Sequence, residues 1–257
     1  MSTGVIDIGS NTIRAVVYDE ELTPVKNSAV HAELVRFVQD GQLLEEGKRR
    51  LVESLLLLKM QVDPCDRVFV FATSALRTVE DRGELLAMIK EETGFTAEIL
   101  SEEEEAACGQ LVLTLVGVDD AVGFDLGGGS MQIFSPDQAK SLKLGSLRLF
   151  LEEGSPQKAY ERARQELGEL PPRKRICGMG GTVRAIGDYF STCLISADML
   201  RRVMSLTPEE ASAFGRRDKS IGCGAAAALA VMEACTAEEI AVLHFGVREG
   251  YLMMKGM

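Results

Sequence analysis

A chain of 257 residues with 46% hydrophobic residues can bury a large core, and we expect it to form two domains. Its formal net charge of −11 argues against a broad surface for nucleic acid, and an anionic ligand would need local positive charge or a divalent cation. No window approaches the roughly 18 apolar residues of a membrane span, and the start lacks the features of a signal peptide. We therefore expect a cytoplasmic protein with no nucleic-acid or membrane partner.

The first elements along the chain are predicted to be a β-hairpin over 3–9 and 13–19, two apolar runs around a short polar turn. Other short apolar runs bounded by turn residues predict further strands. These lie at 30–38, 68–72, 97–100, on both sides of 127–130, at 141–151 with a break at Gly145, and just before a glycine turn at 176–182.

Helical spacing of apolar residues predicts a long amphipathic helix over 43–62, which Pro64 stops. Ser101 is a suitable N-cap for a helix over 102–117, whose first turn holds four glutamates. The helix dipole stabilises acidic residues in a first turn, so capping and solvation alone would explain this run. Further helices are predicted over 81–93, 155–168, 207–215, 222–235 and 237–244, with a last short one after residue 245.

The cysteines and histidines show no spacing typical of a metal site. No two cysteines form a CxxC pair, and the two histidines, His31 and His244, are isolated. We expect neither zinc nor an iron–sulfur cluster, and we expect the cysteines to be buried, reduced thiols. They are Cys65, Cys108, Cys177, Cys193, Cys223 and Cys235.

One strand–turn–strand pattern occurs twice. In the first copy Asp7 and Gly9 end an apolar run, and in the second Asp125 and Gly127 do the same. Three consecutive glycines in the second copy let the backbone approach a ligand and turn its N–H groups inward around an anion. We infer an internal duplication with a phosphate-facing turn in each half, and therefore two lobes with a cleft between them.

A third glycine turn follows a predicted strand and precedes a helix. Such a turn can hold a phosphate or the edge of a nucleoside, although similar turns often only permit close packing. Its residues are Gly178, Gly180, Gly181 and Thr182.

Taken together, these motifs resemble the Ppx/GppA phosphatases, which are exopolyphosphatases and guanosine pentaphosphate phosphohydrolases of the actin, sugar kinase and Hsp70 superfamily. The resemblance covers essentially the whole chain and implies a two-lobed, actin-like ATPase (ribonuclease H-like) α/β fold, with duplicated mixed β-sheet domains around a central cleft. It implies lobes at 1–117 and 118–257, with the last helix packing back on the first. The matching segments are VIDIGSNTIRAVVYD, FATSALR, ILSEEEEA, FDLGGGS, LKLGSLRL, CGMGGTVRAIG and GVREGYL.

The resemblance also implies roles for single residues. Glu105 matches the glutamate that activates the attacking water, and Asp125 the aspartate that positions metal and water, with Asp7 as its partner. These two aspartates suit Mg²⁺, without which they would repel a polyanion. The phosphate contacts implied are Gly9, Ser10, Asn11, Arg77, Gly127, Gly128, Gly129, Ser130, Ser146 and Arg217.

The implied activity is Mg²⁺-dependent release of orthophosphate from the end of inorganic polyphosphate. Larger homologues carry further C-terminal helical domains, and this sequence ends at Met257, so we expect a preference for short chains. The same chemistry on pppGpp is the first alternative. A sensor that binds phosphate or nucleotide without turnover is the second, because Gln132 stands where the family commonly has a carboxylate. A sugar or acetate kinase is a further enzyme alternative.

Basic residues outside the motifs offer a track for a long anionic chain, although 173–175 are more simply read as ordinary surface charge. The residues considered for this track are Lys143, Arg148, Arg173, Lys174, Arg175 and Arg184. The sequence does not decide the oligomeric state, and a homodimer stays open.

Overall fold

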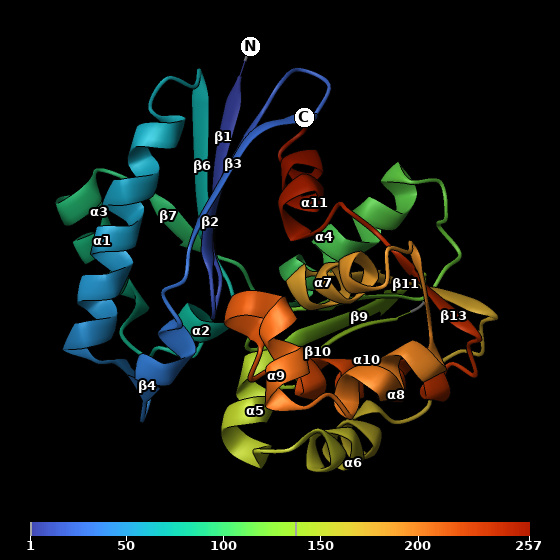
Figure 1. Ribbon diagram of the computed structural model, residues 1–257. Coiled ribbons are helices and arrows are strands. Elements are labelled where there is room, and N and C mark those ends of the chain that lie inside the picture. The colour runs from blue at the N-terminus through green and yellow to red at the C-terminus, as the bar shows by residue number, and fades with distance from the viewer. Residues whose placement is uncertain (1, 137) are drawn as a thin grey trace. The chain divides into compact units, whose positions relative to one another are not determined.

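The computed structural model describes residues 2–136 and 138–257 (Figure 1). The chain forms two compact units, of which the first ends at Ser101 and also takes in Met257, and the second is Glu102–Gly256. The division falls earlier than the boundary expected after residue 117. The reason is that helix α4 (Glu102–Leu115) packs on strand β9 (Met131–Ser135) and on helix α11 (Val247–Met254), all within the second unit.

The first unit contains a five-stranded sheet in the order β3-β2-β1-β6-β7. The three strands nearest the N-terminus pair antiparallel, and β6 and β7 continue the sheet parallel to β1. The strands are β1 (Thr3–Ile8), β2 (Ile13–Tyr18), β3 (Pro24–Val30), β6 (Arg67–Ala72) and β7 (Ala97–Ile99).

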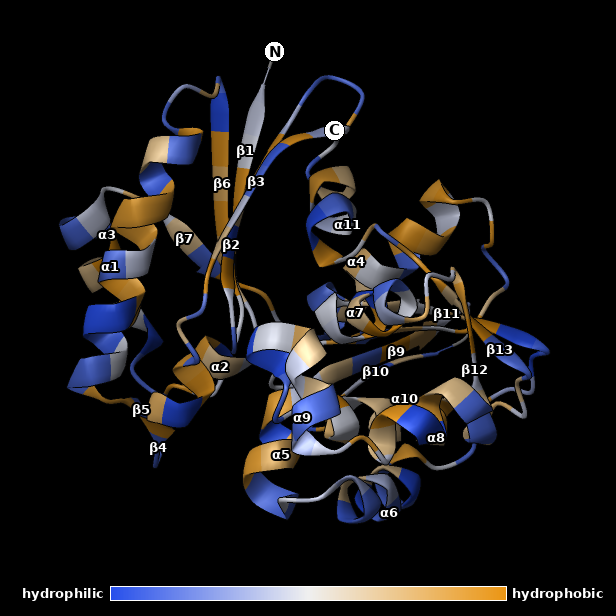
Figure 2. Cartoon of the chain, in the orientation of Figure 1, coloured by the Kyte–Doolittle hydropathy of each residue, from blue (hydrophilic) through white to orange (hydrophobic). Residues whose placement is uncertain are grey.

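Helix α1 (Glu45–Val62) covers one face of this sheet, where Ile6 and Ile8 of β1 pack against Leu51 and Leu55. Figure 2 shows apolar and polar residues alternating around this helix, in agreement with the predicted amphipathic spacing. The remaining elements of the unit are η1 (Leu34–Phe37), β4 (Val38–Gln39), β5 (Gln42–Leu43), α2 (Ser74–Arg77) and α3 (Arg82–Thr93).

The strand predicted over 30–38 is wrong in its position. Strand β3 ends at Val30, and the following residues form a loop and the short helix η1. The amides of Glu33 and Val35 donate to the carbonyls of Asn11 and Ser10, both at 3.0 Å, so this segment is tied to the first glycine turn and does not extend the sheet.

The second unit contains a six-stranded sheet in the order β10-β9-β8-β11-β13-β12. Its first five strands repeat the first sheet, with an antiparallel β8–β9–β10 meander followed by β11 and β13, which run parallel to β8. This matching order confirms the duplication. The strands not yet bounded are β8 (Gly123–Leu126), β10 (Gln138–Leu142), β11 (Arg175–Met179), β12 (Leu194–Ser196) and β13 (Glu239–Val242).

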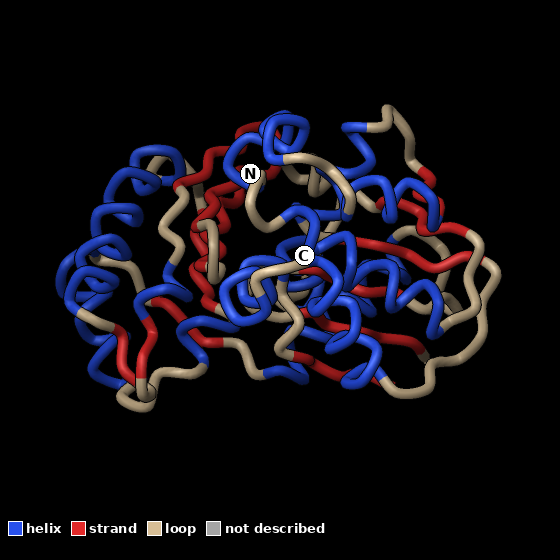
Figure 3. Tube along the Cα trace, turned by 60° about the horizontal axis from the view of Figure 1, so that its bottom comes forward, coloured by secondary structure: helices blue, strands red, loops and turns tan. Residues whose placement is uncertain are grey.

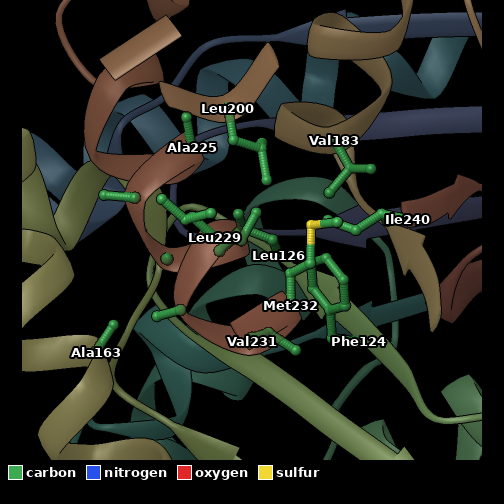
Figure 4. Packing of buried hydrophobic residues seen from close by; sticks show 14 of the residues in the cluster. Phe124, Leu126, Ala163, Val183, Leu200, Ala225, Leu229, Val231, Met232 and Ile240 are labelled. Carbon is green, nitrogen blue, oxygen red and sulfur yellow. The ribbon is translucent and has the colours of Figure 1, made fainter. Parts of the chain in front are cut away.

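Helices pack on both faces of the second sheet, and Figure 3 shows its strands running between them. Phe124, Leu126 and Ile240 of the sheet meet Leu229 and Met232 of helix α10 (Figure 4). On the opposite face Phe134 lies among residues of α4. The other helices are α5 (Ser146–Glu153), α6 (Pro156–Leu167), α7 (Gly181–Tyr189), α8 (Ala197–Met204), α9 (Pro208–Ala211), η2 (Ser212–Arg217) and α10 (Ile221–Ala234).

Two further sequence predictions are wrong. The helix predicted over 237–244 is strand β13, which lies between β11 and β12 inside the sheet. The strand predicted over 141–151 is the end of β10 followed by helix α5, and Gly145 is the N-cap of that helix. Pairing with β11 and β12 overrides the local pattern at β13, and at 146–153 the chain forms a helix from Gly145 onward in place of the predicted strand.

Cys193 is exposed and Cys65 half-buried, so burial holds for the other four cysteines, none of which forms a disulfide. None of the helices in the described part of the chain is both long and apolar enough to cross a membrane.

Candidate functional site

Each of the two glycine turns is closed by an equivalent backbone hydrogen bond. The Gly9 amide donates to the Thr12 carbonyl at 3.1 Å, and the Gly127 amide donates to the Ser130 carbonyl at 3.0 Å. Each turn lies where the parallel strands of its sheet reach their carboxyl ends. In open α/β sheets this edge is where ligands bind.

The first turn has its carbonyls committed to the protein. Ser10 and Asn11 accept from backbone amides of the η1 segment, and Thr12 accepts from Gly9. Among the described residues, the amides of Ser10, Asn11 and Thr12 donate to no backbone carbonyl. The Ser10 hydroxyl is buried and has no hydrogen-bond partner among the described residues. A buried hydroxyl normally has a partner, and a phosphate oxygen would provide one.

Asp7 and Arg77 reach the same edge of the first sheet. Asp7 is next to the end of β1, on the face opposite α1, and pairs across the ladder with Arg14. The Thr73 amide donates to the Ile8 carbonyl at 3.2 Å, which joins α2 to the end of β1. Arg77 at the end of α2 donates from Nη1 to the Leu100 carbonyl at 3.0 Å. The residues of the first unit that are predicted to contact metal or phosphate thus lie at one edge of its sheet.

The second turn is held by the first residues of helix α5. The Gly127 carbonyl accepts from the Ser146 amide at 2.9 Å, and the Gly128 carbonyl from the Leu147 and Arg148 amides at 3.0 and 2.9 Å. The turn therefore occupies amides of the α5 N-terminus that would otherwise bind an anion. Among the described residues, the amides of Gly128, Gly129 and Ser130 donate to no backbone carbonyl, so they are the groups left for an anion.

Arg148 supports the turn and does not extend an anion track. Its Nε donates to the Gly129 carbonyl at 2.8 Å, and its Nη1 pairs with Glu152 at 3.0 Å. Arg175 pairs with Glu239, and Lys174 lies 3.5 Å from Glu238. These pairs agree with the surface-charge reading of 173–175.

The third glycine turn packs against the second. The Thr182 hydroxyl donates to Ser146 Oγ at 3.1 Å, and Ser146 Oγ donates to the Gly127 carbonyl at 3.3 Å. A Cβ on Gly180, whose φ is +93°, would lie 2.7 Å from Asp125 Oδ1. Gly178 instead lies inside β11, where a Cβ would meet Ile240 at 2.6 Å, so this glycine serves core packing.

Arg217 lies over the third turn. A Cβ on Gly181 would come within 2.5 Å of its Nη2, which places the guanidinium at the N-terminus of α7. Burial, and then the charge of Arg184, lower the pKa of Arg217. An anion bound here would favour the charged form of Arg217 and so offset both effects. It would also be stabilised by the positive end of the α7 dipole.

Asp125 and Gln132 face each other across the β8–β9 ladder, on the same face of the sheet as Phe134. Helix α4 covers this face, with Gly109 against the Phe134 ring and Gln110 donating to the Ser135 carbonyl at 3.3 Å. Helix α4, which carries Glu105, therefore lies on the same face of the second sheet as Asp125 and Gln132.

Glu105 differs from the other glutamates of its run, since it is 8% exposed while Glu102, Glu103 and Glu104 are exposed. Burial, followed by the charges of Glu105 and Glu104, raises the pKa of the Cys108 thiol to about 12. Solvation of the first turn therefore accounts for three of the four glutamates and not for Glu105.

Sequence reasoning assigned no role to the start of α11, although its GVREGYL motif was noticed. Gly246 donates its amide to Glu249 Oε2 at 2.7 Å, and a Cβ on Gly246 would lie 3.5 Å from Asp125 Oδ2. Both Arg248 and Glu249 are buried. Gly246 thus lies beside the carboxylate of Asp125, a contact that only the folded chain reveals.

The donor set suits a hard cation held largely by its substrate. No group of three or more His, Cys, Asp or Glu side chains within 2–136 and 138–257 could hold a metal by itself. Each unit supplies one aspartate beside its glycine turn, Asp7 in the first and Asp125 in the second. Mg²⁺ commonly binds through one or two carboxylates together with phosphate oxygens, so the carboxylate of either unit is a chemically suitable ligand.

Comparison with known proteins gives the family and the fold of the chain. A model of the Ppx/GppA phosphatase family matches residues 19–187. Exopolyphosphatase 1 of Mycobacterium tuberculosis is 28% identical over 199 residues, which are 70% of this chain and 53% of that protein. Exopolyphosphatase 1 of Mycobacterium bovis matches with the same values. The chain spans about half the length of these curated relatives.

Solved structures share the fold over their full length. The Aquifex aeolicus member of the Ppx/GppA family has a TM-score of 0.79 at 22% identity, covering 100% of this chain and 97% of that one. An exopolyphosphatase from Cytophaga hutchinsonii has a TM-score of 0.83 at 19% identity, covering 100% and 99%. These similarities confirm the predicted fold class.

Proposed function

Because the chain belongs to the Ppx/GppA phosphatase family, we propose that it hydrolyses the terminal phosphoanhydride bond of inorganic polyphosphate and releases orthophosphate. The observation that carries this proposal is the common design of the two glycine turns. In each turn, carbonyls accept hydrogen bonds within the protein and the three amides after the first glycine donate to no backbone carbonyl among the described residues, with an aspartate near the end of the preceding strand.

In this proposal, groups that donate hydrogen bonds bind the phosphate. The turn amides and the hydroxyls of Ser10 and Ser130 suit phosphate oxygens, and Arg77 and Arg217 add positive charge. Phosphoryl transfer needs little covalent assistance and depends on positioning and charge neutralisation, which these groups provide.

Glu105 is proposed to orient the attacking water and to accept its proton. The water oxygen attacks the terminal phosphorus, the bond to the bridging oxygen breaks, and the shortened polyphosphate leaves as an anion. The burial of Glu105 among exposed glutamates, on a helix that covers the Asp125 face of the second sheet, supports this role.

Asp7 and Asp125 are the proposed Mg²⁺ ligands. When bound, Mg²⁺ supplies positive charge that offsets repulsion between these carboxylates and the phosphate oxygens.

The proposal is tested by measuring phosphate release from polyphosphates of several lengths, from pppGpp and from ATP, with Mg²⁺ and with a chelator. We expect the highest kcat/KM on polyphosphate and no release after chelation. Faster release from pppGpp would assign the nucleotide as substrate. Binding without release from any of these compounds would support the sensor reading and refute the enzyme.

A further inference from the structure

Helix α11 lies against two parts of the proposed site through two glycines that are one helical turn apart. A Cβ on Gly246 would lie 3.5 Å from Asp125 Oδ2. A Cβ on Gly250 would lie under 3.0 Å from the backbone of Cys108 on α4, so the two helices touch there. Glu105 precedes Cys108 by three residues on α4. The start of α11 therefore packs both on Asp125 and on the part of α4 that carries Glu105.

Glu249 binds both backbone groups of Gly246. Its Oε2 accepts from the Gly246 amide at 2.7 Å, and its own amide donates to the Gly246 carbonyl at 3.1 Å. Glu249 is 4% exposed, and a glutamate is rarely buried to this extent unless its carboxylate is paired or hydrogen-bonded. Glu249 thus fixes the backbone that lies beside Asp125.

The other oxygen of Asp125 lies beside the third glycine turn, where a Cβ on Gly180 would come within 2.7 Å of Oδ1. The Leu243 amide donates to the Gly178 carbonyl at 2.8 Å, which ties the chain before α11 to the strand that leads into this turn. Backbone thus lies beside each oxygen of the carboxylate. The last torsion of an aspartate side chain has broad preferences of its own, so such neighbours decide its orientation.

We propose that Glu249 is a positioning residue that holds the start of α11 against Asp125 and so keeps the Asp125 carboxylate in one orientation relative to Glu105. The inference rests on the proposed function, since it concerns two residues to which that function gives roles. Without the hydrogen bond from Gly246 to Glu249, the first turn of α11 would loosen. The Asp125 carboxylate could then rotate, and α4 would lose part of its support.

A different helix holds the groups that donate to phosphate. The carbonyls of Gly127 and Gly128 accept from the first amides of α5, and α11 takes no part in these bonds. Loosening of α11 should therefore misplace Asp125 and Glu105 while the donors of the second glycine turn stay in position. The expected result is a lower kcat with little change in KM.

The test measures phosphate release from inorganic polyphosphate by the full chain at saturating Mg²⁺, and binding of inorganic phosphate by calorimetry. The variants are Glu249→Gln, Glu249→Asp and Glu249→Met. Glutamine keeps an oxygen that can accept from the Gly246 amide, aspartate keeps the charge on a shorter side chain, and the methionine thioether is only a weak acceptor. Ser196→Ala is the matched control, because it removes the N-cap of α8, where Ser196 Oγ accepts from the Met199 amide at 3.3 Å.

We expect Glu249→Met to lower kcat between roughly 10-fold and 100-fold, the larger value corresponding to a misplacement of about 1 Å. Its KM and its affinity for inorganic phosphate should stay within about twofold of the wild type. Glu249→Gln should lose no more than about threefold in kcat, and Glu249→Asp should lose more than Glu249→Gln. Ser196→Ala should unfold at a lower temperature and keep the wild-type kcat.

All rates are compared at a temperature at which thermal unfolding shows each variant to be folded. A wild-type kcat in Glu249→Met would overturn the inference, and so would a kcat that survives in Glu249→Asp and is lost in Glu249→Gln, because the charge and not the hydrogen bond would then matter. If Glu249→Met does not fold, the order of the other two variants still decides. A wild type that releases no phosphate would overturn the proposed function together with this inference, whereas an active wild type with either contrary result would overturn the inference alone.

Discussion

Replacing Gly145 by alanine would force a methyl group into the second glycine turn. An added Cβ would lie under 3.0 Å from backbone atoms of Gly129 and Ser130, where ordinary contacts begin at about 3.4 Å. Backbone cannot swing aside as a flexible side chain can. The φ of −65° and ψ of 146° at Gly145 are allowed for alanine, so the effect is purely steric.

The expected loss of stability is modest and the expected loss of activity is large. Overpacking of this kind reduces the unfolding free energy by about 1–3 kcal/mol. The turn and the first residues of α5 must separate by up to about 1 Å, and a misplacement of that size lowers turnover by roughly 100-fold. Gly145→Ala should therefore remain folded at room temperature while kcat/KM falls roughly 100-fold.

Urea unfolding and phosphate release measure the two effects separately. Gly83→Ala in α3 is the matched control, because a Cβ there meets nothing within 4 Å. That variant should keep wild-type turnover and gain up to about 1 kcal/mol from helix propensity. If turnover of Gly145→Ala stays within twofold of the wild type, the close approach of Gly145 to the backbone of Gly129 and Ser130 is not needed for activity.

Three other outcomes are expected. Glu105→Gln should abolish phosphate release and leave phosphate affinity within a few-fold, and retained turnover would exclude Glu105 as the base. Gly250→Ala should reduce the unfolding free energy by about 2–3 kcal/mol, since its Cβ would collide with the Cys108 carbonyl where α4 and α11 meet; an unchanged urea midpoint would contradict this. Burial raises the pKa of the Cys223 thiol to about 11. Unfolded thiols ionise near pH 9, so the unfolding free energy should fall as pH rises from about 9 to about 11. Cys223→Ala should show a shallower fall, and an identical slope would rule out this linkage.

The sequence by itself determined the features that depend on neighbouring residues. The amphipathic pattern of 43–62 predicted α1 to within two residues, and the alanine-rich segment 222–235 predicted α10 to within one. The two DxG turns were visible because glycine is needed where the backbone approaches a ligand or another segment, and they identified the duplication. Resemblance to a family then supplied candidate roles for single residues of these turns.

Only the tertiary structure decided features that depend on distant partners. Residues 239–242 were predicted to lie in a helix, and they form a strand because they pair in parallel with β11 from Arg175 to Gly178. The register of β8 and β9 sets Gln132 opposite Asp125, and packing of α4 on Phe134 buries Glu105 out of four similar glutamates. A hydrogen bond or a buried contact between residues far apart in sequence leaves no periodic signal in either segment, and the site is built from such contacts.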